Sequence, residues 1–187
     1  RNGRESVKFD NLEFSRIFMA WFIPNLNDQK NIIGLEILAS ILSVGRNSRL
    51  VKILKEDSNL VESVYVDVNA GELGGLFIME ASCESKDIDL VEKQINKTID
   101  EISNCKALAL DEIKKAMNIV KSNYIFNLET STQLSSFFGN ELLWGRKSSI
   151  NNLESHLKYW NDLDNFKEIT EYISGEKFTL VASPGKC

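Results

Sequence analysis

Two charged residues stand where a helical pattern gives way to a strand pattern. In the stretch SRLVKILKEDSNLVESV, residues 48–64, Lys55 falls near the end of the predicted helix and Glu62 at the start of the predicted strand. An ammonium group can donate hydrogen bonds to carbonyl oxygens or to a developing oxyanion, whereas a carboxylate repels both. The two side chains could also neutralise each other as an ion pair. Whether Lys55 and Glu62 form a working site is the first question that the sequence raises.

The rest of the chain offers no self-contained catalytic machinery. The single histidine, His156, lies in LESHLKYW and cannot by itself supply the roughly three ligands of a catalytic zinc or an H-x-x-E-H helix. No G-x-S-x-G elbow, P-loop or G-x-G-x-x-G is present. The glycines of GELGG are typical of a hairpin turn rather than a phosphate-binding loop. The residues alone predict a domain without metal ligands or a nucleophile.

The candidate pair must be positioned by elements on both sides. The run from Leu12 to Ile23 reads as a strand that is apolar on both faces in its second half, which predicts a central place in a sheet. A nearly all-apolar helix, NIIGLEILASILSVG, follows a cap at Asp28 and ends at Gly45. The shorter helix that carries Lys55 begins at Ser48.

After the candidate pair, two alternating runs predict a hairpin through NAGELGG. One face of the first strand carries Val64, Val66 and Val68, and one face of the second carries Gly75, Phe77, Met79, Ala81 and Cys83. Amphipathic helical runs then extend from Asp87, the last of them opened by Asp162 or Asp164, and the strand KFTLVAS closes the chain. This order predicts an α+β fold, a two-layer sandwich with a mostly antiparallel sheet and helices on one face.

Composition excludes several classes of protein. The chain has 187 residues and a net charge of −5, which suits one domain over residues 1–187 and lacks the positive field of a nucleic-acid-binding protein. No run of roughly 18 apolar residues predicts a membrane span.

Three cysteines, Cys83, Cys105 and Cys187, without a C-x-x-C pair predict a reducing, cytoplasmic setting with Cys83 in the core. The chain starts at Arg1 rather than Met, which we interpret as a fragment or a processed product.

The opening stretch is also the most specific one. It resembles the segment S-R-L-x-x-x-L-R-E-E-x-x-L-x-Y-S-V in the second lobe of the insulinase/pitrilysin family of zinc peptidases. The passages LEILASILSVGRNSRL, GGLFIMEASCE, DEIKKAMNIVKSNYIFNLETSTQLSSFFGNELLWG and WNDLDNFKEITEYISGEKFTLVASPG are similar to the family's later segments, in the same order. The resemblance covers about residues 12–185 and includes processing-peptidase-like bacterial subunits. It implies the same α+β sandwich.

This resemblance implies that the chain is the C-terminal, non-catalytic lobe of a longer peptidase-family protein. Zinc would sit in an N-terminal lobe or in a paralogous partner subunit, with peptide as the substrate. In active members this lobe contributes an Arg and a Tyr that bind substrate carbonyls, and those positions are Lys55 and Glu62 here. Both depart from the pattern, which favours a relic, although a retuned contact or two ordinary solvated charges stay open.

Three functions fit these expectations. The first is an enzyme part that closes the chamber and positions peptide substrate, for example by adding it to a sheet edge. The second is a pseudo-peptidase scaffold or partner subunit in a heteromeric assembly. The third is a free-standing ligand-binding domain that shares the shape alone. No nucleic acid or membrane partner is expected, and the bared lobe surface could self-associate.

Overall fold

One five-stranded sheet organises the chain in the computed structural model, which describes residues 2–103, 108–143 and 150–185. Its strand order is β1-β5-β2-β4-β3, and only the β1–β5 pair is parallel. The strands are β1 (Gly3–Phe9), β2 (Ser15–Ile23), β3 (Val61–Ala70), β4 (Gly75–Cys83) and β5 (Lys177–Pro184). The α+β class and the mostly antiparallel sheet are thus confirmed.

Strand β2 takes the central position that its two apolar faces predict. It pairs with β4 on one side and β5 on the other, both antiparallel. The β3–β4 hairpin is also confirmed, and its turn is closed by a 2.9 Å hydrogen bond from the Gly71 amide to the Gly74 carbonyl. Strand β1 lies outside the predicted elements, because its exposed alternation carries little apolar signal.

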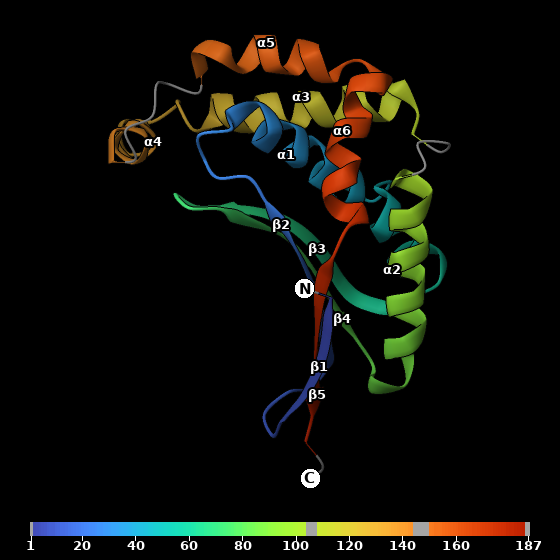
Figure 1. The fold of residues 1–187 in the computed structure, drawn as a ribbon. Coiled ribbons are helices and arrows are strands. Elements are labelled where there is room, and N and C mark those ends of the chain that lie inside the picture. Colours follow the sequence, from blue (N-terminus) through green and yellow to red (C-terminus); the bar gives the residue numbers. More distant parts are fainter. Residues whose placement is uncertain (1, 104–107, 144–149, 186–187) are drawn as a thin grey trace.

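Helices cover one face of the sheet, as Figure 1 shows. They are α1 (Gln29–Ser43), the π-helix η1 (Val51–Asp57), the 3-10 turn η2 (Ser85–Asp87), α2 (Ile88–Ser103), α3 (Leu110–Phe126), α4 (Ser131–Leu143), α5 (Ile150–Trp160) and α6 (Leu163–Ser174). The first of them, α1, is buried nearly all round because α3, α5 and α6 cover the sides that β3 leaves free. No helix among the described residues is long and apolar enough to cross a bilayer.

The predicted caps of α1 are present. Asp28 accepts a hydrogen bond from the Asn31 amide at 3.3 Å, and Gly45 follows the helix with a φ of 88°, where a side chain would be strained. Gly34 allows a close crossing, since a Cβ there would come within 2.6 Å of Ile169 and 2.8 Å of Trp160. Asp162, rather than Asp164, caps α6.

The two faces of the sheet differ in what covers them. The helix-side residues of the central strands are buried, including Trp21 of β2, Phe77 of β4 and Val181 of β5. The opposite residues alternate with them and stay uncovered by any described helix: Phe22 is 77% exposed, Tyr65 63% and Phe178 40%. The sheet therefore presents an open face that mixes aromatic, aliphatic and charged side chains.

Cys83 ends β4 and is buried, as expected of a core residue. Burial, with the nearby charge of Asp87, raises the pKa of its thiol to about 11, so the thiol is neutral at physiological pH. Cys105 and Cys187 lie outside the described residues.

Candidate functional site

Lys55 lies in the short helix η1, which the sequence predicts as helical but not as a π-helix. The Ser58 hydroxyl donates to the Ile53 carbonyl at 2.6 Å, and the Leu60 amide to the Leu54 carbonyl at 2.7 Å. Asn59 turns the chain with a φ of 50°. Leu54 is fully buried, whereas Lys55 is exposed. The helix is thus anchored by one leucine and presents Lys55 toward the start of β3.

Glu62 is displaced by a β-bulge. Val61 pairs with Cys83 and Ser63 with Ser82, so Glu62 is an extra residue without a partner on β4. The bulge brings Val61 onto the same buried face as Val64 and turns the Glu62 side chain to solvent. The Glu62 side chain therefore lies in solvent, although Glu62 has the same sequence parity as Val64, Val66 and Val68.

The two candidate residues do meet, but not as an ion pair. The Lys55 ammonium donates a 2.6 Å hydrogen bond to the backbone carbonyl of Glu62. Among the ion pairs of the described residues, there is none between the Lys55 ammonium and the Glu62 carboxylate. The hypothesis of a side-chain ion pair is wrong, because the bulge aims the carboxylate outward and leaves the carbonyl facing η1.

An ion pair fixes the segment that leads into η1. Arg49 reaches Glu112 at the start of α3 with two hydrogen bonds, 3.0 Å from Nε to Oε1 and 2.7 Å from Nη2 to Oε2. Glu112 also accepts from the Ala109 amide at 3.1 Å. Burial raises the pKa of Glu112, but these hydrogen bonds and the charge of Arg49 lower it more, so the net shift is downward. The pair ties η1 to α3.

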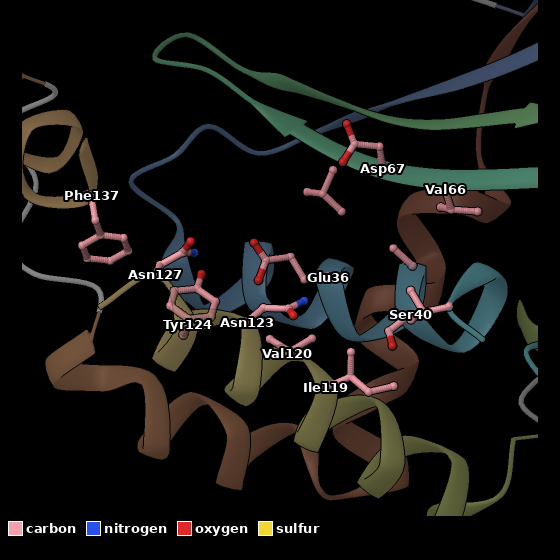
Figure 2. Close-up of a pocket in the computed structure, with 13 residues that line it drawn as sticks. Glu36, Ser40, Val66, Asp67, Ile119, Val120, Asn123, Tyr124, Asn127 and Phe137 are labelled. Atoms are coloured by element: carbon pink, nitrogen blue, oxygen red, sulfur yellow. The ribbon is translucent and has the colours of Figure 1, made fainter. Parts of the chain in front are cut away.

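A second feature is a cavity of about 410 Å³ between α1, β3 and α3, drawn in Figure 2. Its polar lining residues come from three elements and the segment after α3, and its remaining walls are apolar. The lining residues are Glu36, Ala39, Ser40, Val44, Val66, Asp67, Val68, Ile119, Val120, Asn123, Tyr124, Asn127 and Phe137. Among the described residues that line the cavity, the charged ones are the two acids Glu36 and Asp67.

Glu36 is the central acid of this cavity. Burial raises the pKa of Glu36 to about 7, against a lowering hydrogen bond from the Tyr124 hydroxyl and with a further increase from the charge of Asp67. One turn along α1, Ser40 is 5% exposed and its hydroxyl oxygen has no hydrogen-bond partner. Glu36 and Ser40 therefore line one cavity, but the Ser40 hydroxyl oxygen is shielded from it.

The described residues do not fit a zinc ion. They contain no group of three or more His, Cys, Asp and Glu side chains placed to hold a metal. His156 lies half-buried on α5, where burial and the charge of Lys30 lower the pKa of its imidazole.

The comparisons with known proteins agree with this geometry. The family described as "Peptidase M16 inactive domain" matches residues 1–119, which is more than half of the chain. This chain belongs to the peptidase M16 inactive-domain family. The resemblance to zinc peptidases of the insulinase type, drawn from the sequence, is thereby confirmed.

Curated relatives of this M16 domain are considerably longer than it. The mitochondrial-processing peptidase subunit alpha-2 of Dictyostelium discoideum is 27% identical over 154 residues, 78% of this chain and 34% of that protein. A protein named an uncharacterized zinc protease in Streptomyces coelicolor is 28% identical over 118 residues, 63% of this chain and 26% of its own length. The chain thus spans about a third of these relatives or less.

Solved structures share the fold of this M16 domain. A protease from Helicobacter pylori superposes with a TM-score of 0.86 at 16% identity, over 97% of this chain and 44% of that one. A chain of complex III2 from Candida albicans gives 0.81 at 18% identity, over 97% and 46% respectively. At these identities the likeness shows the fold alone.

Sequence reasoning found the Lys55–Glu62 neighbourhood of this M16 domain but missed the cavity. A signal was present: Glu36 and Ser40 are polar residues four apart in an otherwise apolar helical run, so they share one face. Tyr124, which hydrogen-bonds Glu36, lies 88 residues after it in sequence. Only the packing of α3 on α1 brings Tyr124 to Glu36.

Proposed function

We propose that this chain is the non-catalytic C-terminal lobe of a zinc-dependent endopeptidase-family protein, and that it closes a chamber and positions peptide substrate there. In this proposal the zinc lies in an N-terminal lobe or a partner subunit, since the residues that the structure describes contain no group placed to hold a metal. The family description and the zinc protease among the relatives support this assignment.

The observation that carries the positioning role is the open face of the sheet. Phe22, Tyr65 and Phe178 are exposed there, and cross-strand pairing sets smaller apolar residues beside them, as with Ala20 beside Phe178. Exposed apolar surface of this kind marks a contact surface. A peptide bound there would bury side chains on the face, while its backbone would be free to reach a metal held by another lobe.

Lys55 has a different part in this proposal. Its ammonium already binds the Glu62 carbonyl, and the Ser43 hydroxyl accepts from the Val66 amide at 3.1 Å. Both contacts satisfy backbone groups of the edge strand β3, which hinders pairing of a peptide strand there. We assign Lys55 a structural role, and Glu62 no role in binding substrate carbonyls.

The test uses the full-length protein, alone and mixed with its nearest encoded relative. We expect bound zinc and peptide cleavage in one of these samples. Tyr65→Ser and Phe22→Ser should raise KM for a peptide roughly fivefold with little change in kcat, because they remove binding contacts and no reacting group. Leu73→Ser is the control, since Leu73 is 97% exposed in the β3–β4 turn. An unchanged KM in both face variants would contradict the positioning role.

A second candidate is a partner or scaffold subunit without a catalytic lobe. The departures at Lys55 and Glu62 favour it, and similarity to a processing-peptidase alpha subunit and to a chain of complex III2 is consistent with it. Absence of zinc from the purified full-length protein, with zinc and activity appearing only in the relative, would support this candidate over the first.

A further inference from the structure

The sheet has two edge strands, and they differ in how their outer edges are covered. At β3, the Lys55 ammonium binds the Glu62 carbonyl. The Ser43 hydroxyl also accepts from the Val66 amide, so part of that edge is blocked. Among the described residues, β1 pairs with β5 alone, in one continuous register over its seven residues. An open edge of this kind is a template for another strand, so β1 is the edge at which the sheet can be extended.

One hydrogen bond shows which backbone groups of β1 face outward. The Gly185 amide, just past the end of β5, donates to the Phe9 carbonyl at 2.8 Å, so Phe9 turns its backbone groups toward β5. The direction of the backbone groups alternates along a strand. Arg4, Ser6 and Lys8 therefore turn their amide and carbonyl groups to the outer edge. Within the part of the chain that the structure describes, no strand pairs with them.

Three charged residues lie on β1, and two of them stay available to a partner. Arg4 is engaged, because its guanidinium forms an ion pair with Glu92 of α2 at 3.2 Å. The ion pairs of the described residues include neither Lys8 nor Glu5, and both are exposed. Because side chains alternate, Lys8 lies on the helix side with Arg4, and Glu5 lies on the open face. A partner strand therefore meets one cation and one acid, on opposite faces.

The open-face side chains of β1 become apolar toward its end. Val7 is 39% exposed and Phe9 is 51% exposed, and Ala182 and Pro184 of β5 lie in register beside them. Cross-strand apolar neighbours and opposite charges stabilise a sheet, whereas like charges directly opposite destabilise it. A partner strand gains most by placing apolar side chains beside Val7 and Phe9.

A second copy of this chain is a poor partner for β1. A two-fold axis pairs β1 with itself in the antiparallel sense, so residues of equal parity face each other. Centring the pair on Glu5 sets two carboxylates together, and centring it on Ser6 sets Arg4 opposite Lys8. Centring it on Val7 avoids this but gives Lys8 and Glu5 no opposite charge. The charges on β1 thus favour a strand of different sequence.

We infer that the outer edge of β1 binds an extended segment of another protein as an added antiparallel strand, with an acidic residue opposite Lys8 and a basic residue opposite Glu5. Apolar side chains of the segment lie beside Phe9 and Val7. From its N-terminus the segment reads apolar, acidic, apolar, any residue, basic. Main-chain hydrogen bonds supply the affinity and the side-chain pairs supply the specificity. The inference goes beyond the proposed function, because this partner docks at the sheet edge and is not a substrate on the open face.

The experiment uses the peptide acetyl-Ile-Glu-Val-Thr-Lys-Thr with a C-terminal fluorescein, and reads its binding to the full-length protein by fluorescence anisotropy. The control peptide, acetyl-Ile-Lys-Val-Thr-Glu-Thr with the same label, has the same composition and the two charges exchanged. We expect a Kd on the order of 0.1–1 mM for the first peptide. The control should bind roughly tenfold more weakly, since both charge pairs become repulsive. Equal binding of the two peptides, or no saturable binding of the first, would overturn the inference.

Exchanging the charges on the protein tests which strand is responsible. The double variant Glu5→Lys with Lys8→Glu keeps the net charge and changes only exposed side chains. It should reverse the preference, so that the control peptide binds roughly tenfold more tightly than the first. Lys121→Glu with Glu154→Lys exchanges an ion pair on α3 and α5, across the molecule from β1 (Figure 1), and should leave the preference unchanged. A preference that does not reverse in the β1 variant would contradict binding at this edge.

Methylated peptides test whether the backbone pairs. In the antiparallel ladder, the first Thr of the peptide lies opposite Ser6 and turns its amide to β1, whereas the Val opposite Val7 turns its amide away. N-methylation of that Thr should abolish binding, and N-methylation of the Val should weaken it less than roughly threefold. Equal losses for the two methylated peptides would contradict strand pairing.

A variant of the edge itself completes the test. Ser6→Pro removes an outward amide, which an edge strand tolerates, and should abolish peptide binding with little change in thermal unfolding. Full binding by a folded Ser6→Pro protein would contradict the inference. Sedimentation equilibrium of the same two proteins tests the alternative occupant. We expect Ser6→Pro to leave the oligomeric state unchanged, and a wild-type dimer that Ser6→Pro dissociates would identify a second copy as the occupant instead.

Discussion

The Lys55 ammonium lies 2.6 Å from the backbone carbonyl oxygen of Glu62 and donates a hydrogen bond to it. Lys55, near the end of η1, thus donates a hydrogen bond to the backbone at the bulged start of the edge strand β3. The zinc-peptidase pattern has an Arg and a Tyr at these two positions. Here the side chain of Lys55 instead binds the backbone carbonyl of Glu62. The contact is local and leaves the Glu62 carboxylate in solvent.

This arrangement predicts an asymmetry between the two residues. Lys55→Met removes the donor and should lower the free energy of unfolding by about 0.5–1.5 kcal/mol. Glu62→Gln keeps the backbone carbonyl and should change it by less than about 0.5 kcal/mol. Urea unfolding of both variants measures the difference. A larger loss for Glu62→Gln than for Lys55→Met would instead indicate an ion pair.

The Arg49–Glu112 pair should couple η1 to α3. In a double-mutant cycle with Arg49→Met and Glu112→Gln, we expect a coupling free energy of about 1 kcal/mol, because the pair is bidentate but partly solvated. Because the fold lowers the pKa of Glu112, the ionised carboxylate stabilises the folded state fully at pH values above its unfolded-state pKa. This stabilisation should be lost as pH falls through the lower folded-state pKa. A coupling that persists unchanged into strong acid would contradict this.

The titration of Glu36 should make stability depend on pH with the opposite sign. Its pKa is raised to about 7 in the fold, so the folded state holds a proton that the unfolded chain loses nearer 4.5. Stability therefore falls as pH rises from 4.5 to 7, and the penalty is complete above that window. Glu36→Gln should stabilise the protein by about 2 kcal/mol near pH 8 and have little effect near pH 4.5. Thermal unfolding at both pH values checks this, and equal effects at both would refute it.

Two glycines in helices should respond differently to alanine. Gly34→Ala places a methyl group within 2.6 Å of Ile169 and should destabilise the fold by about 1–3 kcal/mol through overpacking. Gly139→Ala in α4 meets no heavy atom within 4 Å and should stabilise by about 0.5–1 kcal/mol through helix propensity. Differential scanning calorimetry separates the two. A stabilised Gly34→Ala protein would contradict the close crossing of α1 with α6.

Sequence periodicity predicted the elements whose burial repeats regularly. Strand β2 is apolar on both faces and lies at the centre of the sheet, and the hairpin valines and the helix capped by Asp28 were found from the same kind of signal. These predictions succeed because burial there follows a period of two or 3.6 without interruption.

The failures occur where the period is interrupted or where distant segments meet. The bulge turns the Glu62 side chain away from the face that Val64, Val66 and Val68 share, and one extra residue leaves no mark in a single sequence. Strand β1 pairs with β5 at the far end of the chain, so its exposed residues carry no pattern of their own. The cavity combines α1, β3 and α3, and its chemistry exists only after they pack.

The parallel pairing of β1 with β5 has a mechanical consequence. Gly3 lies opposite Phe178 and Phe9 opposite Pro184, so the start of one strand and the end of the other lie at opposite ends of the ladder (Figure 1). Tension applied between the chain entering β1 and the chain leaving β5 would pull the strands past each other and load all their hydrogen bonds at once. The β1–β5 pair would therefore resist this tension in shear. The lifetime of the folded lobe under load would be set by the rate at which the hydrogen bonds between β1 and β5 rupture.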